Sequence, residues 1–411
     1  MISDVVVVTA SLSIDGGSSK VALTSALALA GSGVRVPLFT AFGLPSADLA
    51  SCERLRVIST GQAEALNDPN RFAAALRGLW NFRAYRMMRD ALAKLDRKRT
   101  IVHVHGWTKA LSASVIAASV ASRFPLVVTL HEYFTACPTG CLYLHRDNKV
   151  CTIKPMSPAC IVKDCDSRSY IFKLYRVVRQ WIAMYAAGVP WAVANFITVS
   201  LFSRKVMEPL LPSGKRFYPI DNPVDVAMSG RVTAEENARF VYIGRLSAEK
   251  GVLLLAEAAR RADVSVEFVG DGELRGEIER INPEAAVTGW LDPAAVARRL
   301  QGARCVVVPS LWYETLGLVV LEGAGAGIPA VVPNDTAVRD LVAADVSGLV
   351  FERGDVDRLT AALIALKSDS LVRRLSEGAY RSYWRQPRTM SAHVTALQAA
   401  YEDILESGRA S

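Results

Sequence analysis

The 411-residue chain contains no uninterrupted hydrophobic run that is typical of a membrane span. Residues 181–202 carry no charge but are interrupted by Gly188, Pro190 and Asn195, and this pattern predicts a helix, a turn and a strand. No basic residue precedes the short apolar run at residues 5–8, so we expect no secretory signal peptide. A cytoplasmic protein is the expectation that remains.

Signatures of other protein classes are also absent. The loop DGGSSK, residues 15–20, does not have the G-x-G-x-x-G spacing of dinucleotide-binding proteins, which weighs against a nicotinamide-dependent oxidoreductase. No signature of a nucleic-acid-binding module is present. The five cysteines between residues 137 and 165 form no C-x-x-C pair, which is the usual spacing of zinc ligands.

Charge is distributed unevenly along the chain. Residues 1–220 carry a net charge of +14 and the remainder a net charge of −6, within a total of +8. The length itself favours two domains of roughly 200 residues each. A basic first half can meet anionic lipid, a phosphorylated acceptor or nucleic acid, of which nucleic acid is the weakest alternative.

Short apolar strands alternate with helical stretches in both halves, which predicts parallel sheets with helices on both faces. The turn-rich segment IDNPVD, residues 220–225, is expected to link the two units. Ligands of such sheets lie at the carboxyl ends of the strands, and we expect the site in a cleft between the units. The expected strands are residues 5–9, 34–39, 101–106, 126–132, 196–200, 239–243, 264–269, 286–288, 305–308, 330–332 and 348–351.

The segment PSLWYETLGLVVLEGAGAGIPAVVP, residues 309–333, is nearly apolar but contains Glu314 and Glu322 and no basic residue. Because an unpaired buried carboxylate is costly, a partner from outside is required, and we expect a ligand. A helix that starts near Leu316 and Gly317 presents its first amides to an anion such as phosphate. Glu322 can then accept the hydroxyls of a ribose and Glu314 those of a sugar. The alternatives are that Glu322 is a partly exposed helix residue and that Glu314 caps the helix.

Two further strand ends in the second half carry polar or flexible residues. In YIGRLSAEKG, residues 242–251, Arg245 and Lys250 are suited to a diphosphate, although solvated surface charges are the simpler interpretation of this segment taken alone. VGDGEL, residues 269–274, contains a Gly-Asp-Gly turn. We expect all three segments at the same edge of one sheet.

Taken in this order and spacing, the three segments resemble the retaining glycosyltransferases of family 4 (glycosyltransferase group 1), which have the GT-B fold. The family's two glutamates separated by seven residues are matched by Glu314 and Glu322, and its Gly-Arg-Leu…Glu-Lys-Gly by GRLSAEKG. The resemblance covers most of the chain and is strongest over residues 239–352. It implies an α/β architecture of two Rossmann-like doubly wound domains that face a cleft.

The domains implied by this resemblance have different substrates. Residues 1–221 are expected to bind the acceptor and residues 222–385 the nucleotide-sugar donor. A C-terminal helix at about residues 386–411 is expected to cross back to the first domain.

The resemblance also implies roles for individual residues. His131 in TLHEYF matches a histidine that faces the donor sugar, and His105 in HVHG is an acceptor-side candidate. A hydrogen-bonded core histidine is the alternative for His105 and the preferred interpretation of His103. The expected catalytic residues are His131, Arg245, Lys250 and Glu314. The expected donor-binding residues are Gly16, Gly17, Gly244, Arg245, Lys250, Asp271, Glu314, Leu316, Gly317, Leu318 and Glu322.

The implied reaction moves a sugar from a UDP- or GDP-sugar to a glycan or lipid-linked acceptor, with retention at the anomeric carbon, in bacterial polysaccharide or glycolipid biosynthesis. Arg245, Lys250 and the helix amides would stabilise the departing diphosphate in place of a metal, so no catalytic cofactor is expected. Neither glutamate is expected to act as a covalent nucleophile. A non-catalytic sugar-nucleotide-binding or scaffold protein of the same fold is the alternative.

Two features of the first half lie outside this site. Resemblance to an insertion in some bacterial members of the family selects Cys137, Cys151, Cys160 and Cys165 as ligands of a structural zinc. Reduced, partly buried cysteines are the alternative that the spacings favour.

The segment from Arg71 to Arg99 has nine basic and two acidic residues among large apolar ones. This pattern predicts a basic amphipathic helix that can lie on an anionic membrane, such as the cytoplasmic face of the inner membrane. A solvated helix face with an ordinary core stripe is the alternative.

Overall fold

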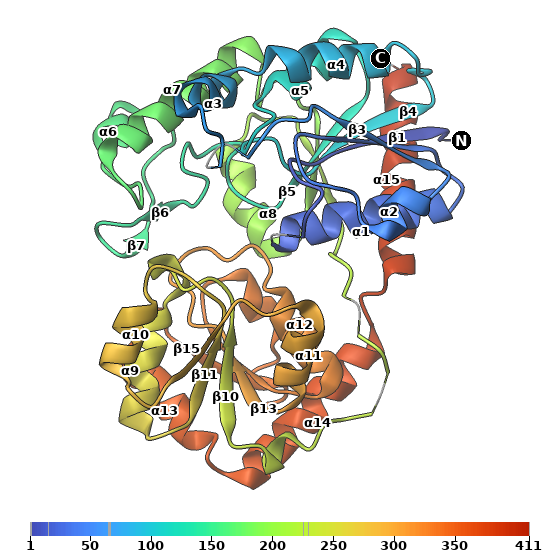
Figure 1. Ribbon diagram of the computed structural model, residues 1–411. Coiled ribbons are helices and arrows are strands. Elements are labelled where there is room, and N and C mark those ends of the chain that lie inside the picture. The colour runs from blue at the N-terminus through green and yellow to red at the C-terminus, as the bar shows by residue number, and fades with distance from the viewer. Residues whose placement is uncertain (1, 15, 65–66, 225, 229, 411) are drawn as a thin grey trace. The chain divides into compact units, whose positions relative to one another are not determined.

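A computed structural model describes residues 2–14, 16–64, 67–224, 226–228 and 230–410. For residues 409 and 410 it describes the backbone alone. Asp15 of the DGGSSK loop and Asp225 of the expected linker lie outside the described residues. The chain forms two compact units (Figure 1). The first comprises Met1–Cys141, Ile153–Pro223 and Arg388–Ser411, and the second comprises Leu142–Thr152 and Val224–Pro387.

The first unit is built on a seven-stranded parallel sheet whose strand order is β3-β2-β1-β4-β5-β8-β9. Its central strands are almost entirely buried, because helices cover both faces of a parallel sheet. The direction of strand addition reverses between β1 and β4, which is where such sheets bind ligands. The strands are β1 (Asp4–Val8), β2 (Val36–Thr40), β3 (Leu55–Ser59), β4 (Thr100–Val104), β5 (Leu126–Leu130), β8 (Asn195–Thr198) and β9 (Arg216–Pro219).

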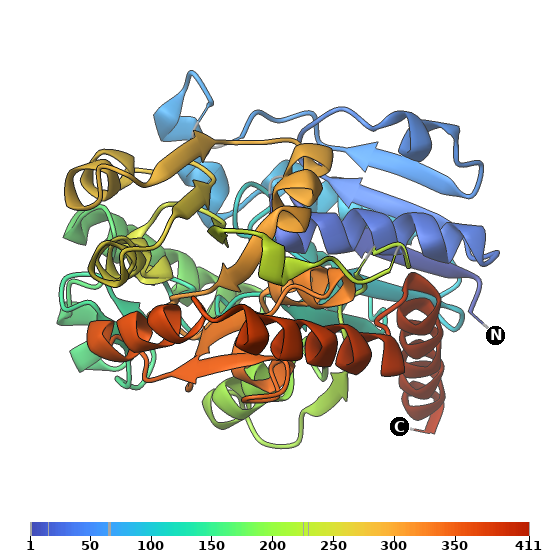
Figure 2. The same cartoon turned by 90° about the horizontal axis from the view of Figure 1, so that it is seen from below.

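The helices of the first unit include one from the end of the chain. They are α1 (Gly17–Gly31), α2 (Ala47–Ser51), α3 (Arg71–Leu79), α4 (Phe82–Leu92), α5 (Ser114–Ala121), α6 (Pro158–Val162), α7 (Tyr170–Ala186), α8 (Leu201–Met207) and α15 (Met390–Ala410). Helix α15 packs beside α1 (Figures 1 and 2). Leu397 and Tyr401 of α15 are buried in the same core as Val5 and Leu29. The expected return of the C-terminal helix to the first domain is therefore confirmed.

The second unit has a six-stranded parallel sheet with the order β12-β11-β10-β13-β14-β15. Here the direction reverses between β10 and β13. The strands are β10 (Arg239–Ile243), β11 (Val266–Val269), β12 (Ala286–Gly289), β13 (Ala303–Val307), β14 (Ala330–Pro333) and β15 (Gly348–Phe351). The helices are α9 (Val252–Ala262), α10 (Arg275–Ile281), α11 (Pro293–Gln301), α12 (Leu318–Ala326), α13 (Val356–Ala365) and α14 (Asp369–Arg385). Two doubly wound parallel sheets are thus confirmed.

Some elements were not expected from the sequence. The antiparallel hairpin of β6 (Tyr143–Leu144) and β7 (Lys149–Val150) groups with the second unit, although the residues on either side of it belong to the first. Strands β3 and β9 lie at the two edges of the first sheet and are only partly buried. Their apolar pattern is correspondingly weak.

The basic segment from Arg71 to Arg99 forms two helices, α3 and α4, so the prediction of one amphipathic helix is wrong. Trp80 ends α3 in an extended conformation, and the Asn81 side chain caps α4 by accepting a hydrogen bond from the backbone of Ala84 at 3.0 Å. Among the described residues, no helix has the length and apolar character to cross a membrane.

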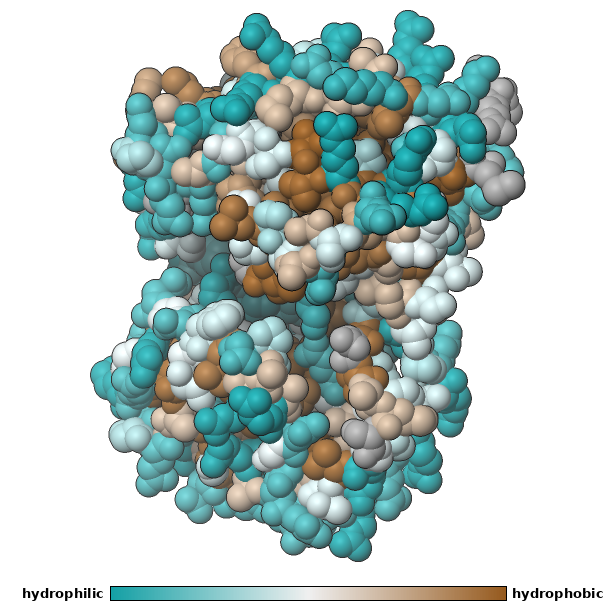
Figure 3. All heavy atoms as spheres, turned by 45° about the vertical axis from the view of Figure 1, so that its right-hand side comes forward, coloured by the Kyte–Doolittle hydropathy of each residue, from teal (hydrophilic) through white to brown (hydrophobic). Residues whose placement is uncertain are grey.

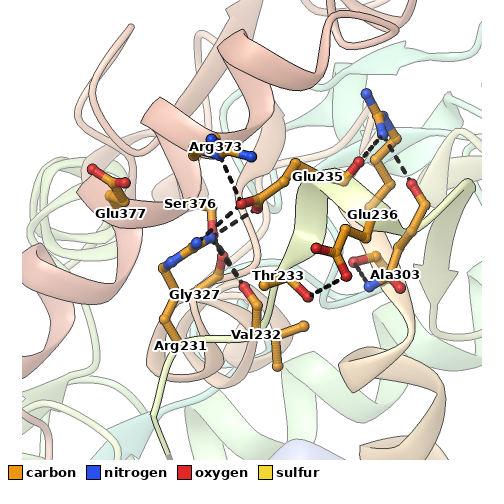
Figure 4. A network of polar contacts seen from close by, with 12 residues as sticks. Arg231, Val232, Thr233, Glu235, Glu236, Ala303, Gly327, Arg373, Ser376 and Glu377 are labelled. Atoms are coloured by element: carbon orange, nitrogen blue, oxygen red, sulfur yellow. Dashed lines mark hydrogen bonds and ion pairs between the residues drawn. The ribbon is translucent and has the colours of Figure 1, made fainter.

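A buried carboxylate connects the start of the second unit to α14 (Figure 4). Glu235, whose side chain is 3% exposed, accepts hydrogen bonds from Arg231 at 2.8 and 3.0 Å and from Arg373 at 3.0 Å. Arg231 also donates to the hydroxyl of Ser376 at 2.8 Å. The hydrogen bonds from Arg231 are the largest cause that lowers the pKa of Glu235 to about 2.

We expect Glu235→Gln to lower the free energy of unfolding of the second unit by about 2 kcal/mol, because it leaves the guanidinium of Arg231 without its anionic partner. Urea denaturation followed by tryptophan fluorescence measures this change. Arg373→Gln is the matched control: the Arg373 side chain is 63% exposed, so its loss should cost less than about 1 kcal/mol. Equal effects of the two variants would contradict a dominant role for the Arg231–Glu235 pair.

Candidate functional site

Three loops meet at the carboxyl edge of the second sheet. They follow β10, β11 and β13, and backbone hydrogen bonds join them: Gly244 donates to Val269, Leu246 to Asp271 and Leu311 to Glu249, at 2.9 to 3.0 Å. Strands β11, β10 and β13 are neighbours in the sheet. The three polar segments that the sequence singled out therefore lie side by side.

Glycine is required where these loops touch. A Cβ atom at Gly270 would collide with the carbonyl oxygen of Gly244, and one at Gly251 with that of Pro309. Both glycines also have positive φ angles, +148° and +70°, which side chains disfavour. The close approach holds the loop containing Arg245 and Lys250 against the loop containing Glu314.

Glu314 is paired within the protein. Both of its carboxylate oxygens accept hydrogen bonds from Lys250 Nζ, at 2.7 and 3.0 Å. Oε2 also accepts from Ser310 Oγ at 3.0 Å and Trp312 Nε1 at 3.1 Å. Burial would raise the pKa of Glu314, but the Lys250 ammonium and these hydrogen bonds hold it below its usual value. The expectation that a ligand is needed to pair this carboxylate is wrong: Lys250, from 64 positions earlier, does so.

The two cations of the site are held differently. The Lys250 side chain is 20% exposed, and its ammonium lies 4.9 Å from the centre of the Trp312 ring. The Arg245 side chain is 67% exposed, and one nitrogen donates to the buried Glu249 at 2.7 Å. Ser247 Oγ also donates to Glu249, at 2.7 Å. Arg245, held by the buried Glu249, and Lys250, paired with Glu314, can together bind an anion.

Helix α12 begins immediately after Gly317, close to the expected position. Gly317 has φ +83°, and a Cβ atom there would collide with the side chain of Val338. No side chain caps the first turn. Leu316 is buried and Leu318 is half-buried, and the half-buried Glu322 lies more than one turn into the helix. This geometry directs the helix N-terminus, which favours anions, to the same edge as Arg245 and Lys250.

Asp271 and the two N-terminal glycines lie at exposed positions. Asp271 accepts a hydrogen bond from the amide of Gly272 at 2.8 Å, which stabilises the turn after β11. Gly16 precedes α1 and Gly17 is its first residue. These glycines and His131 belong to the first unit, whereas Asp271 belongs to the second.

A pocket in the first unit lies at the carboxyl ends of β1, β4 and β5, next to its own reversal point. It has a volume of about 620 Å³, including the space at its mouth, and its lining includes His105 and His131. The two imidazoles face each other, with His105 Nδ1 3.0 Å from His131 Nε2. Burial is the main cause that lowers the pKa of His131 to about 3.

His103 lies deeper, as the sequence interpretation preferred. Both of its nitrogens are engaged at 2.6 Å, one with the hydroxyl of Tyr401 on α15 and one with the hydroxyl of Thr129 on β5. It is fully buried and serves the core that α15 completes.

The cysteines do not form an evident metal site. No group of three or more His, Cys, Asp or Glu side chains in the described part of the chain is arranged to hold a metal ion. Cys160 Sγ instead lies 3.5 Å from the ammonium of the fully buried Lys173, and Cys137 and Cys165 are close enough to affect the pKa of Lys173. Cys151 belongs to the other unit. The zinc set Cys137, Cys151, Cys160 and Cys165 thus gains no support.

Sequence reasoning missed the residues that orient the site rather than line it. Glu249, Ser310 and Trp312 were not selected, although each holds Arg245 or Glu314 in place. A signal was present, because Glu249 stands inside the Glu-Lys-Gly motif and Trp312 two positions before Glu314. Their partners, however, are visible only once the loops are placed together.

Family models match almost the whole chain. The model described as Glycosyltransferase Family 4 matches residues 15–227, and the one described as Glycosyl transferases group 1 matches residues 228–382.

Curated relatives match over shorter stretches. A GDP-mannose-dependent alpha-mannosyltransferase of Mycolicibacterium smegmatis is 34% identical over 164 residues, which cover 40% of this chain and 43% of that protein. The UDP-Gal:alpha-D-GlcNAc-diphosphoundecaprenol alpha-1,3-galactosyltransferase of Escherichia coli is 24% identical over 229 residues, 50% of this chain and 58% of that protein. The chain thus spans about half the length of these relatives.

Solved structures share the fold at low sequence identity. Sucrose-phosphate synthase from Thermosynechococcus elongatus has a TM-score of 0.67 at 16% identity, over 98% of this chain and 100% of that chain. Anabaena HepE in complex with UDP has a TM-score of 0.64 at 15% identity, with the same coverage.

The histidines of the first unit make its stability depend on pH. Burial is the main cause that lowers the pKa of His103, His105, His131 and His393. Unfolded histidines bind protons below about pH 6.5 while these four stay neutral in the folded state, so acid favours unfolding. We expect the free energy of unfolding to fall by up to about 1.4 kcal/mol per pH unit for each histidine below that pH. Urea titrations between about pH 7.5 and 5 test this.

The fifth histidine supplies the control. His145 belongs to the second unit and is only half-buried, so His145→Gln should leave this acid dependence unchanged. A stability profile that is flat across the same interval would contradict neutral, buried histidines.

Proposed function

The chain belongs to glycosyltransferase family 4 and has the GT-B fold, and we propose that it is a retaining enzyme that uses a UDP- or GDP-sugar as its donor. The acceptor in this proposal is a glycan or a lipid-linked sugar of bacterial polysaccharide or glycolipid biosynthesis. The observation that carries the proposal is the pairing of Lys250 with Glu314 beside Arg245 and the start of α12.

The donor diphosphate fits the cationic part of this arrangement. Arg245 is mostly exposed, and Lys250 can turn from the carboxylate of Glu314 to a phosphate oxygen, because its flexible stem carries a point charge. The amides at the start of α12 add dipoles of the same sign. When the bond to the sugar breaks, negative charge grows on the diphosphate, and these groups stabilise it without reorganisation.

The two glutamates have separate tasks in the proposal. Glu314 stays ionised, so it accepts hydrogen bonds from sugar hydroxyls. Its oxygens already accept bonds from Lys250, Ser310 and Trp312, which makes it a poor candidate for a covalent nucleophile. Glu322, further along α12, is proposed to bind the ribose. The acceptor then attacks from the face that the diphosphate leaves, and the departing phosphate takes its proton.

Surface chemistry of the first unit supports a lipid-linked acceptor. Helices α3 and α7 pack together, with Tyr175 donating to the carbonyl of Ala75 at 2.8 Å. Figure 3 shows, for one face of the molecule, how apolar side chains reach the surface between hydrophilic ones. With the basic residues from Arg71 to Arg99, the exposed apolar side chains on or next to α3, α4 and α7 suit peripheral binding to an anionic membrane. The exposed apolar residues on or next to α3, α4 and α7 are Phe72, Leu76, Phe82, Ile171, Phe172, Leu174, Val178, Trp181 and Tyr185.

A non-catalytic nucleotide-binding or scaffold protein is the second candidate. Such a protein is expected to lose some of the charged residues that serve only turnover. Arg245, Lys250, Glu314 and Glu322 are all present, and Lys250 and Glu314 are joined. This favours the enzyme.

Nucleotide binding without a divalent ion tests the proposal. We expect UDP or GDP, in excess EDTA, to raise the thermal midpoint of the wild type by about 2–4 °C, since a ligand at 100 times its Kd stabilises by about 2.7 kcal/mol. ADP and NAD should have little effect. Glu322→Ala should abolish the shift, because the ribose loses its acceptor. Differential scanning fluorimetry measures the thermal midpoint with each of the four nucleotides.

Glu277→Ala is the matched control, because Glu277 is an exposed carboxylate of the same unit, and it should keep the full shift. A shift that appears only when Mg²⁺ is added would overturn the metal-independent mechanism. No shift with any nucleotide would favour the scaffold.

A further inference from the structure

One side chain of the β6–β7 hairpin has a polar atom without a partner. The hairpin belongs to the second unit, and Tyr143 in it is 1% exposed. A two-stranded hairpin of this length has no core of its own, so the burial of Leu142, Tyr143 and Leu144 comes from the structure around it. The hydroxyl of Tyr143 has no hydrogen-bond partner among the described residues. Because buried hydroxyls nearly always have a partner, this one needs an explanation.

Two charged groups lie close enough to this hydroxyl to affect its pKa. Burial is the main cause that raises the pKa of Tyr143, the carboxylate of Glu249 raises it further, and the guanidinium of Arg353 opposes the change. The hydroxyl therefore stays protonated and can donate a hydrogen bond. Arg353 already donates to the carbonyl of Asp335 at 3.1 Å, and a guanidinium cannot accept a hydrogen bond. Of the two charged groups, only Glu249 can accept one from Tyr143.

Glu249 has other donors in the free protein. Its Oε1 accepts hydrogen bonds from Arg245 Nη2 and from Ser247 Oγ, each at 2.7 Å. Burial would raise the pKa of Glu249, but the hydrogen bond from Ser247 and the charge of Arg245 hold it below its usual value. The buried carboxylate is therefore ionised, and the loss of its cation without a replacement would be costly.

Binding of a diphosphate acts on this arrangement. In the proposed function, on which this inference rests, Arg245 binds the donor diphosphate. Its Nε and Nη2 now donate to Ser247 and Glu249, at 3.3 and 2.7 Å. This parallel pair of N–H groups is also the geometry in which a guanidinium binds a phosphate through two hydrogen bonds. A phosphate that takes the pair leaves Glu249 in need of another donor.

We propose that Tyr143 is a positioning residue for the donor: when Arg245 turns to the diphosphate, the hydroxyl of Tyr143 replaces it on the carboxylate of Glu249. Ser247 keeps its hydrogen bond to Glu249 in both states. The Tyr143 hydroxyl is unpaired in the free protein and paired in the complex, so the free-energy cost of leaving it unpaired is recovered on binding and raises the affinity for the nucleotide.

A double-mutant cycle on the nucleotide-free, full-length protein tests the replacement without a ligand. Tyr143→Phe alone should leave the thermal midpoint unchanged or raise it, because it removes an unpaired hydroxyl. Arg245→Ala removes the guanidinium, so the hydroxyl of Tyr143 should then bond to Glu249. In that background, Tyr143→Phe should lower the midpoint by about 2–4 °C. Tyr380→Phe is the matched control: Tyr380 is a half-buried tyrosine on α14 of the same unit, and its effect should be equal in both backgrounds.

Calorimetric titration with UDP and GDP measures the effect on binding. Tyr143→Phe should weaken binding of the nucleoside diphosphate about tenfold, the loss expected for one hydrogen bond, and Tyr380→Phe should not. NMR of ¹³Cζ-labelled tyrosines reports the hydrogen bond of each hydroxyl. The Tyr143 signal should move when the nucleotide is added to the wild type, and it should move in the same direction in free Arg245→Ala.

The proposal is overturned if the effects of Tyr143→Phe and Arg245→Ala on the midpoint are additive, or if Tyr143→Phe binds the nucleotide as the wild type does. The NMR comparison decides even if Tyr143→Phe fails to fold: an identical Tyr143 signal in the free wild type and in Arg245→Ala contradicts the replacement. If no nucleotide binds to the wild type, the proposed function fails instead. The free proteins still show, in that case, whether Tyr143 replaces Arg245 on Glu249.

Discussion

The pairing of Lys250 with Glu314 is the interaction on which the site depends. Each residue alone would be costly in its loop, because Glu314 is largely buried and Lys250 is mostly enclosed. The pairing keeps the Glu314 carboxylate ionised and keeps the Lys250 ammonium beside it. In the proposed function, a diphosphate binds the ammonium of Lys250, and sugar hydroxyls then replace that ammonium on the carboxylate of Glu314. On this proposal, the pair couples the binding of the two ends of a sugar nucleotide.

The fold delivers this pair through ordinary features of parallel sheets. Strands β10 and β13 are neighbours at the point where the direction of strand addition reverses, so their loops emerge together. Gly251 and Gly270 allow backbone contact between the loops where any side chain would collide. Glu249 then joins the loops that follow β10 and β13. Its carboxylate accepts a hydrogen bond from Arg245, and its backbone carbonyl accepts one from Leu311. In the first sheet the pocket likewise lies beside β1 and β4, the strands between which the direction of strand addition reverses.

Sequence patterns predicted the features that depend on local chemistry. The bounds of β10 and β15 agree with their apolar runs, and α12 starts immediately after Gly317, where a positive φ favours glycine. The features that the sequence did not predict depend on contacts between residues far apart in the chain. Lys250 could not be recognised as the partner of Glu314 from 64 positions away, and the break at Trp80 between α3 and α4 contains neither glycine nor proline.

Calorimetric titration of Glu314→Gln with UDP and GDP tests the exchange of Lys250 most directly. In the wild type a diphosphate has to compete with the Glu314 carboxylate for the ammonium. Neutral glutamine removes that competitor, so the account predicts that the variant binds the nucleoside diphosphate as tightly as the wild type or up to about tenfold more tightly, while transfer of sugar is lost. Binding that is about tenfold weaker in Glu314→Gln would show that the carboxylate supports the diphosphate site, and the account would then be wrong.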